Sequence, residues 1–348
     1  MVYADYAATH PYVKYPSSAY VPFLNPNANY AYKEKRLLSE AEDRIKKAIG
    51  AKGGKVVFGG TSSQLIENLF THIYDETHEY LTICSVYEHD SVWRFADQWG
   101  NIDSLKHAIQ THLGDKQLIV CLMGVNNLTG EIMPVEEIGK LCHEHDAFYI
   151  CDMTAMIGHT PIPANIDQWC DCAVWSGHKL GTELGIGAMW VSDKLDKWLN
   201  GFKLHGTPNL AGALAMTQAV EEACDVSSLE ERQVQWMDLS DELYSRLLDI
   251  CPNVKQIGNN EGCWAINAIH LPGFNADALQ QYLASKQIYV SIGGSACTEK
   301  HDYRVLNAYG LSNDEASEVI RVSFGEDSSI EDVKALVNGI KEFKEKFV

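Results

Sequence analysis

The chain has 348 residues, of which 46% are hydrophobic, and its formal net charge at pH 7 is −19. A chain of this size can bury a large core and exceeds the usual size of one compact domain, so we expect one large and one smaller domain. The acidic balance argues against direct binding to nucleic acid or to an anionic membrane, because both favour clustered Lys and Arg. The longest apolar run, near residues 118–125, is too short to cross a bilayer.

The cysteines indicate a reducing compartment. The ten cysteines are scattered and lack the dense, regular spacing of a small secreted disulfide scaffold. The first residues, MVYADYAATH, lack the basic and apolar segments of a secretory leader. We therefore expect a cytoplasmic protein with free thiols.

Apolar segments rich in Val, Ile and Tyr alternate with longer segments of helical period as far as residue 191. The expected strands lie at residues 55–58, 80–86, 117–125, 147–151, 172–175 and 187–191. This alternation predicts an α/β fold in which a mostly parallel central sheet carries helices on both faces. Ligands bind beside the ends of the strands in such a sheet.

A long helical stretch follows Thr207 and runs to Ile250, with candidate turns near residues 225–228. A second αβ region then contains the segments WAINAIHL, YVSIGG and VIRVSFG. We predict a large domain over residues 12–235 and a small domain formed by residues 1–11 and 236–348.

Lys179 is the first candidate catalytic residue. It follows an apolar strand in AVWSGHKLGTELGIGAMW and precedes a glycine-bearing turn. A lysine that reacts as a neutral amine needs a lowered pKa, and a Schiff base with a cofactor is one use of such an amine. A solvated loop lysine is the commoner use of this residue type.

Two further segments fit the same chemistry. Asp152 ends strand FYICD, where a carboxylate could keep the ring nitrogen of a pyridinium cofactor protonated. Thr61 and Ser62 open a helix directly after strand KVVFGG, where hydroxyl and backbone N–H groups bind phosphate. Each also has a structural alternative, since Asp, Ser and Thr commonly cap helices.

Three more residues are candidates from their positions. His89 follows strand YLTICSV and could stack on a cofactor ring or move protons, or could simply cap a helix. Asn127 ends LIVCLMGVNN and could bond a ring hydroxyl or form a turn. Cys297 lies in the small-residue segment SIGGSACTEKHDYRV, where a thiolate could reach a bound substrate.

No metal site is expected. His143 and His145 stand two positions apart on a predicted helix and point to different sides. Cys170 and Cys172 lack the second pair that a structural zinc site needs.

Taken in order, these segments resemble the cysteine desulfurases of the class V aminotransferase group, which are fold-type I pyridoxal-phosphate enzymes. YADYAATHP is similar to the family's YLDNAATTP start, and VNNLTGEIMPVEEIGKLCHEHDAFYICD to its VNNEIG-to-HVDA region. WSGHKLGTELGIGA is similar to SAHKxxGPKGIGA, HGTPNLAGALA to the SGT segment, GGSACT to SGSACT, and VIRVSFG to IRFSLG. The resemblance runs nearly from end to end.

The resemblance implies a role for each matching residue. Lys179 holds the cofactor as a Schiff base, His89 stacks on its ring, Asp152 pairs with the pyridinium nitrogen, and Asn127 lies near the ring hydroxyl and the substrate. Thr61, Ser62, Ser176 and His178 bind the phosphate, and Thr207 reaches the phosphate of the neighbouring subunit, which implies a homodimer with shared active sites. Arg321 holds the substrate carboxylate, and Cys297 accepts the sulfur.

The implied activity is conversion of L-cysteine to L-alanine with transfer of sulfur to Cys297 as a persulfide, and onward to an acceptor protein. That acceptor could serve iron–sulfur cluster assembly, tRNA modification or DNA modification. Ala155 departs from the family, which has a glutamine at this position. Two alternatives stay open: another reaction on the same cofactor, namely transamination, selenocysteine cleavage or a different β-elimination, and an inactive homologue that acts as a scaffold.

Overall fold

The computed structural model describes residues 1–20, 23–77, 79–293 and 302–348, which form two compact units. Unit 1 comprises Met1–Pro11, Val125–Ile132 and Ser227–Val348, and unit 2 comprises Tyr12–Gly124 and Met133–Val226. Residues 125–132 and 227–235, which the sequence pattern assigned to the large domain, thus belong to unit 1 with the C-terminal region.

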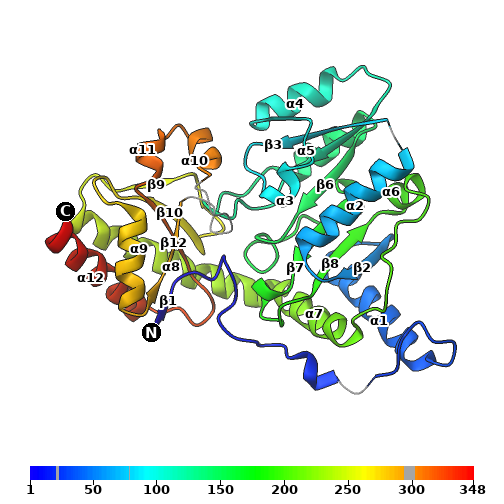
Figure 1. Ribbon diagram of the computed structural model, residues 1–348, viewed down its shortest axis with the longest axis horizontal. Helices are drawn as coiled ribbons and strands as arrows, with labels where there is room; N and C mark the ends of the chain where they lie inside the picture. The colour runs from blue at the N-terminus through cyan, green and yellow to red at the C-terminus, as the bar shows by residue number, and fades with distance from the viewer. Residues whose placement is uncertain (21–22, 78, 294–301) are drawn as a thin grey trace. The chain divides into compact units, whose positions relative to one another are not determined.

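Unit 2 is built around a seven-stranded sheet (Figure 1). Its strands, in spatial order, are β2 (Lys55–Gly59), β8 (Gly187–Val191), β7 (Cys172–Ser176), β6 (Phe148–Asp152), β5 (Gln117–Cys121), β3 (Tyr80–Ser85) and β4 (Gln98–Gly100). Strand β8 runs antiparallel to both neighbours, and the other adjacent pairs are parallel. The mostly parallel α/β sheet predicted from the sequence is confirmed, whereas the short edge strand β4 was not expected.

Helices cover both faces of this sheet. On one face α2 (Ser62–Thr77) contacts β2, β7 and β8, and it shares a buried core with α3 (Asp90–Trp93) and α6 (Asp193–Trp198). Alternate strand residues such as Ile150 and Val174 belong to this core, and the intervening Cys151 and Ala173 are also buried, as the period of two requires of a sheet covered on both sides.

The remaining helices of unit 2 complete its layers. Helices α4 (Ile102–Thr111) and α5 (Val135–Glu144) lie side by side, and α5 contacts β6 (Figure 1). Helix α1 (Tyr32–Ala48) packs along α7 (Leu210–Ala223) and contacts β2. Short 3-10 turns of the unit are η1 (Ser17–Tyr20), η2 (Ile166–Gln168) and η3 (His178–Leu180).

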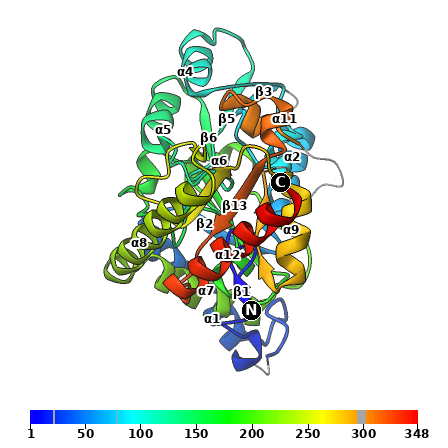
Figure 2. The ribbon, with the colours of Figure 1, turned by 90° about the vertical axis from the view of Figure 1, so that its left-hand side faces the viewer.

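Unit 1 contains an antiparallel sheet and a parallel strand pair. The sheet has the order β12 (Ser291–Ile292), β13 (Val319–Ser323), β10 (Ile266–His270) and β9 (Lys255–Ile257), and β1 (Val2–Tyr3) pairs with β11 (Ile288–Tyr289). Its helices are α8 (Val226–Ile250), α9 (Ala276–Ser285), α10 (Arg304–Ala308), α11 (Asn313–Ala316) and α12 (Ile330–Phe347). Helices α9 and α12 pack against each other (Figure 2).

The N-terminal segment is joined to β13. The backbone of Ala4 accepts a hydrogen bond from Ser323 N at 2.9 Å, and Ala7 N donates to the Ser323 hydroxyl, also at 2.9 Å. Asp5 forms a parallel bridge with the same serine. This pairing places the side chain of Asp5 beside Arg321 on β13.

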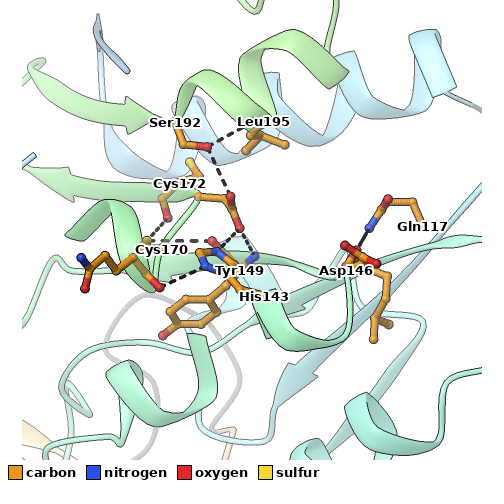
Figure 3. Close-up of polar contacts among 11 residues, drawn as sticks. Gln117, His143, Asp146, Tyr149, Cys170, Cys172, Ser192 and Leu195 are labelled. Atoms are coloured by element: carbon orange, nitrogen blue, oxygen red, sulfur yellow. Dashed lines mark hydrogen bonds and ion pairs between the residues drawn. The ribbon is translucent and has the colours of Figure 1, made fainter. Parts of the chain in front are cut away.

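A buried polar network closes the end of the unit 2 sheet at which β6 and β7 begin (Figure 3). The Asp171 carboxylate accepts from Tyr149 N at 3.0 Å and from the Ser192 hydroxyl at 3.3 Å, and His143 Nε2 lies 2.9 Å from it. His143 is thus a structural partner of Asp171. Among the described residues, no group of His, Cys, Asp and Glu is arranged to hold a metal ion, and no helix is long and apolar enough to cross a membrane.

Candidate active site

Lys179 stands where β7 ends. The strand closes on the buried Ser176, and η3 then carries the lysine up to Gly181, whose φ of +84° ends the turn. The turn is tight, because a Cβ on Gly177 would lie 2.3 Å from Thr182 Oγ1 and 2.8 Å from Met216 Cε. Lys179 is therefore held half-buried at a strand end, as its sequence position predicted.

Burial and the neighbouring charge of Lys179 together lower the pKa of His178 from 6.5 to about 4. The imidazole is therefore neutral at pH 7. A neutral ring has one N–H donor and one acceptor nitrogen. His178 can thus donate a hydrogen bond to an anion without first taking up a proton.

Asp152 closes β6, the strand next to β7, and is buried. Since β6 and β7 are parallel neighbours, Asp152 and Ser176 end at the same edge of the sheet. The Asp152 Oδ1 atom accepts a hydrogen bond from Thr154 N at 2.9 Å, which fixes the carboxylate. The Thr154 hydroxyl is buried without a hydrogen-bond partner in the described part of the chain, and Ala155 beside it is also buried.

The start of α2 lies against the same edge. Thr61 caps this helix, because its hydroxyl accepts from Gln64 N at 3.0 Å. Gly187 of β8 pairs with Ser176, and a Cβ on it would lie 2.7 Å from Thr61 C and 2.8 Å from Ser62 N. The structure thus brings Thr61, Ser62 and Ser176 together, around first-turn N–H groups that lack helical acceptors and favour an anion.

His89 caps α3 after the end of β3. Its Nδ1 atom accepts from Ser91 N at 3.2 Å, which is the structural alternative considered for this residue. The adjacent Glu88, which the sequence reasoning missed, is buried, and its Oε1 accepts from Ser85 Oγ at 2.5 Å and from Met123 N at 2.8 Å. Glu88 thereby fixes the His89 loop to the ends of β3 and β5. In the sequence, the only indication of this role was that an acidic residue directly precedes the candidate histidine.

Asn127 and Arg321 both belong to unit 1, and the structure brings them together. Arg321 is buried on β13, and its Nη1 donates to the Asn127 carbonyl oxygen at 2.9 Å. Its Nη2 donates to Asp5 Oδ1 at 2.8 Å and to Ser291 Oγ at 3.0 Å. The sequence reasoning missed Asp5 and Ser291, and only the position of Asp5 in the opening motif YADYAATHP could have suggested it.

Thr207 and Cys297 are the two remaining predicted residues. Thr207 is exposed in unit 2, where its hydroxyl accepts a hydrogen bond from Asn25 Nδ2 at 3.5 Å. Cys297 lies outside the described residues.

The unit 2 residues fit pyridoxal phosphate. The cofactor needs an amine for its aldehyde, a carboxylate for its ring nitrogen and donors for its phosphate, and Lys179, Asp152 and the start of α2 have these properties. The contact of Gly187 with Thr61 leaves no room for a side chain beside the start of α2. The unpartnered Thr154 hydroxyl, two residues after Asp152, is a further polar atom that a bound group could satisfy.

This fold and this donor set define an enzyme of the fold-type I class. The family model for class-V aminotransferases matches residues 2–336, so the chain belongs to the class-V aminotransferase family, whose members are in general pyridoxal-phosphate enzymes. The family predicted from the motifs is thus confirmed.

Curated relatives match nearly the whole chain. A cysteine desulfurase IscS of Dictyoglomus turgidum is 27% identical, with 99% of this chain and 95% of the relative covered. A protein named cysteine desulfurase IscS from Methanosarcina thermophila is 28% identical, with 99% and 92% covered.

Solved structures show the same fold. A NifS-like protein from Rickettsia africae has a TM-score of 0.84 at 22% identity, with 99% of both chains covered. A cysteine desulfurase from Thermococcus onnurineus, solved in its apo form, has a TM-score of 0.77 at 21% identity, with 99% of this chain and 94% of that one covered.

Proposed function

We propose that the protein is a pyridoxal-phosphate-dependent cysteine desulfurase, which converts L-cysteine to L-alanine and receives the sulfur on Cys297 as a persulfide. One observation carries the proposal: Lys179, Asp152 and Ser176 stand at one edge of the unit 2 sheet in a chain similar over nearly its whole length to proteins named cysteine desulfurase.

Residues of unit 2 would hold the cofactor at its aldehyde, its ring and its phosphate. Asp152 pairs with the ring nitrogen and His89 stacks on the ring. The start of α2 with Thr61, Ser62, Ser176 and His178 binds the phosphate. When bound, the cofactor withdraws electrons from the α-carbon of the substrate. Asp152 sustains that withdrawal because its carboxylate keeps the ring nitrogen protonated.

The protein's residues then divide the reaction. Lys179 Nζ would hold the cofactor at its aldehyde and, once released, would take the α-proton of the substrate. Arg321 binds the substrate carboxylate through its planar set of donors, with Asn127 beside it. The Cys297 thiolate attacks the substrate sulfur, so that an S–S bond forms and the C–S bond breaks. The electron pair left on the β-carbon takes up a proton, for which His89 is the proton donor or acceptor, and Lys179 returns a proton to the α-carbon, which gives alanine.

The exposed surface around Thr207 supports a homodimer with shared sites, in which the partner subunit's Thr207 reaches the phosphate. The side chain of Asn27 donates to the Gly206 carbonyl at 2.9 Å, which joins the two loops, and Leu24, Tyr30 and Tyr32 nearby in sequence are exposed. Exposed apolar residues of this kind favour a protein contact.

A cytoplasmic location accords with the nine described cysteines, none of which forms a disulfide. Sulfur then passes from Cys297 to an acceptor protein, for which iron–sulfur cluster assembly is the destination suggested by the IscS name of the relatives.

The test is turnover of L-cysteine with reductant by the wild type and by Cys297→Ala. The wild type is expected to form alanine and sulfide in equal amounts, and Cys297→Ala is expected to lose both. Cys224→Ala is the matched control, because Cys224 is a half-buried cysteine at the end of α7 to which no role is assigned. Full turnover by Cys297→Ala, or no sulfide from cofactor-loaded wild type, would contradict the proposal.

The buried Ala155 favours a second candidate, another reaction on the same cofactor such as transamination, selenocysteine cleavage or a different β-elimination. In these reactions Cys297 would be dispensable. Comparing amino-acid substrates for keto-acid, alanine and sulfide formation separates the cases. If protein purified in the presence of the cofactor shows no cofactor absorption band, that result would instead support the alternative of an inactive homologue that acts as a scaffold.

A further inference from the structure

Arg321 is a nearly completely buried cation. Its side chain is 6% exposed, and its ion pair with Asp5 has a distance of 2.8 Å. A buried charge needs a partner and further hydrogen bonds to offset the loss of water. Ser291 contributes to both sides of this pair, because its hydroxyl donates to Asp5 at 2.8 Å and accepts from Arg321 Nη2 at 3.0 Å.

The three groups come from separate segments that the sheet of unit 1 aligns. Ser291 on β12 is the register partner of Arg321 on β13. Asp5 reaches the same strand through its bridge with Ser323. The carboxylate is therefore fixed on one side of the guanidinium by backbone pairing, and Asn127 O accepts from Nη1 at 2.9 Å.

The guanidinium keeps donors for another acceptor. Of the five N–H donors of an arginine, the contacts with Asp5, Ser291 and Asn127 use three, which leaves two. The Nε atom is buried, and within the described residues it has no hydrogen-bond partner. A carboxylate, with its two acceptor oxygens, is the group that such donors bind best.

We propose that Asp5 is a positioning residue for carboxylate recognition. Together with Ser291 it fixes the plane of the Arg321 guanidinium and balances its charge, so that the remaining donors bind the α-carboxylate of an amino-acid substrate. The inference rests on the proposed role of Arg321 in binding substrate. Asp5 is 316 positions away from Arg321 in the chain. If Asp5 has this role, the selectivity of the enzyme for α-amino acids over simple amines depends on it.

The experiment compares L-alanine with ethylamine, which differ only in the carboxylate. Each ligand is titrated into the cofactor-loaded enzyme at constant pH, and the change in the cofactor absorption band gives the dissociation constant. Asp5→Ala is expected to weaken L-alanine binding about tenfold or more and to leave ethylamine binding within about twofold. Asp5→Asn, which keeps a neutral acceptor, is expected to give a smaller loss. For L-cysteine turnover, KM should rise much more than kcat falls.

Glu318→Gln is the matched control. Glu318 lies directly before β13, its Oε2 atom is 2.8 Å from His270 Nε2, and among the described residues it forms no hydrogen bond with Arg321. Its loss should lower thermal stability without changing the ratio of the two dissociation constants. If Asp5→Ala does not fold, Ser291→Ala tests the same arrangement with a smaller change. The ratio of the dissociation constant of ethylamine to that of L-alanine is then expected to fall.

The outcomes separate the two proposals. A wild type that binds L-alanine no more tightly than ethylamine overturns the role of Arg321, and with it the proposed function. A wild type that discriminates between the ligands, together with a folded Asp5→Ala or Ser291→Ala variant that discriminates equally well, overturns the role of Asp5 alone.

Discussion

Gly187→Ala tests the proposed phosphate-binding role of the sheet edge in unit 2. The added Cβ would lie 2.7 Å from Thr61 C, 2.8 Å from Ser62 N and 3.1 Å from Thr61 Cα, whereas ordinary contacts are 3.4–4 Å. These atoms are backbone, so the start of α2 must move away from β8 by several tenths of an ångström. The N–H groups of the first helical turn would move with it.

The size of the effect follows from the overpacking. Extra methyl groups in well-packed sites cost about 1–3 kcal/mol. If this strain is relieved by moving the helix start, the affinity for pyridoxal phosphate falls about 5- to 140-fold, since about 1.4 kcal/mol is a factor of ten. The affinity for pyridoxal, which lacks the phosphate, should change much less.

The assay is titration of cofactor-free protein with pyridoxal phosphate and with pyridoxal, together with thermal unfolding. Gly114→Ala is the control, because the nearest atoms to its Cβ would belong to the side-chain ring of His112, at 3.2 Å or more, on an exposed turn. Wild-type affinity for pyridoxal phosphate in Gly187→Ala would refute the reasoning. An equal loss for both ligands would also refute it, because the disturbance would then not be at the phosphate.

Two further predictions concern His178 and Asp171. The pKa of His178 is about 4 in the folded protein against 6.5 ordinarily, so below pH 6.5 the unfolded chain binds a proton that the folded chain does not. Urea unfolding of the cofactor-free protein should therefore show a free energy of unfolding that falls as the pH drops from 6.5 towards 4, and that falls less steeply in His178→Gln. The same pH dependence in the variant and the wild type would contradict this. Asp171→Ala removes the acceptor shared by Tyr149 N, Ser192 and His143 and should lower the free energy of unfolding by about 1.5–3 kcal/mol. His143→Gln should lower it less, and unchanged urea midpoints in both variants would count against the network of Figure 3.

Most strands of unit 2 could be predicted, because the apolar pattern of a strand is contained in a few consecutive residues. The apolar segments before Lys179 and up to Asp152 form the adjacent strands β7 and β6, so the expected strand-end positions of these two residues agree with the structure. The direction of β8 was not predictable in this way, because an apolar strand has the same period of two whether it pairs parallel or antiparallel. The three-residue strand β4 is too short to show any period.

The sequence by itself determined the α/β class, the strand-end positions of Lys179 and Asp152 and the family, since side-chain periodicity and ordered motifs are properties of neighbouring residues. Only the tertiary structure decided the partners of the buried charges. Asp5 meets Arg321 across 316 residues because β1 and β13 enter one unit, and Asp171 meets His143 because α5 packs beside β6. Such pairs depend on which segments the fold brings together, and that information is absent from any local stretch of the chain.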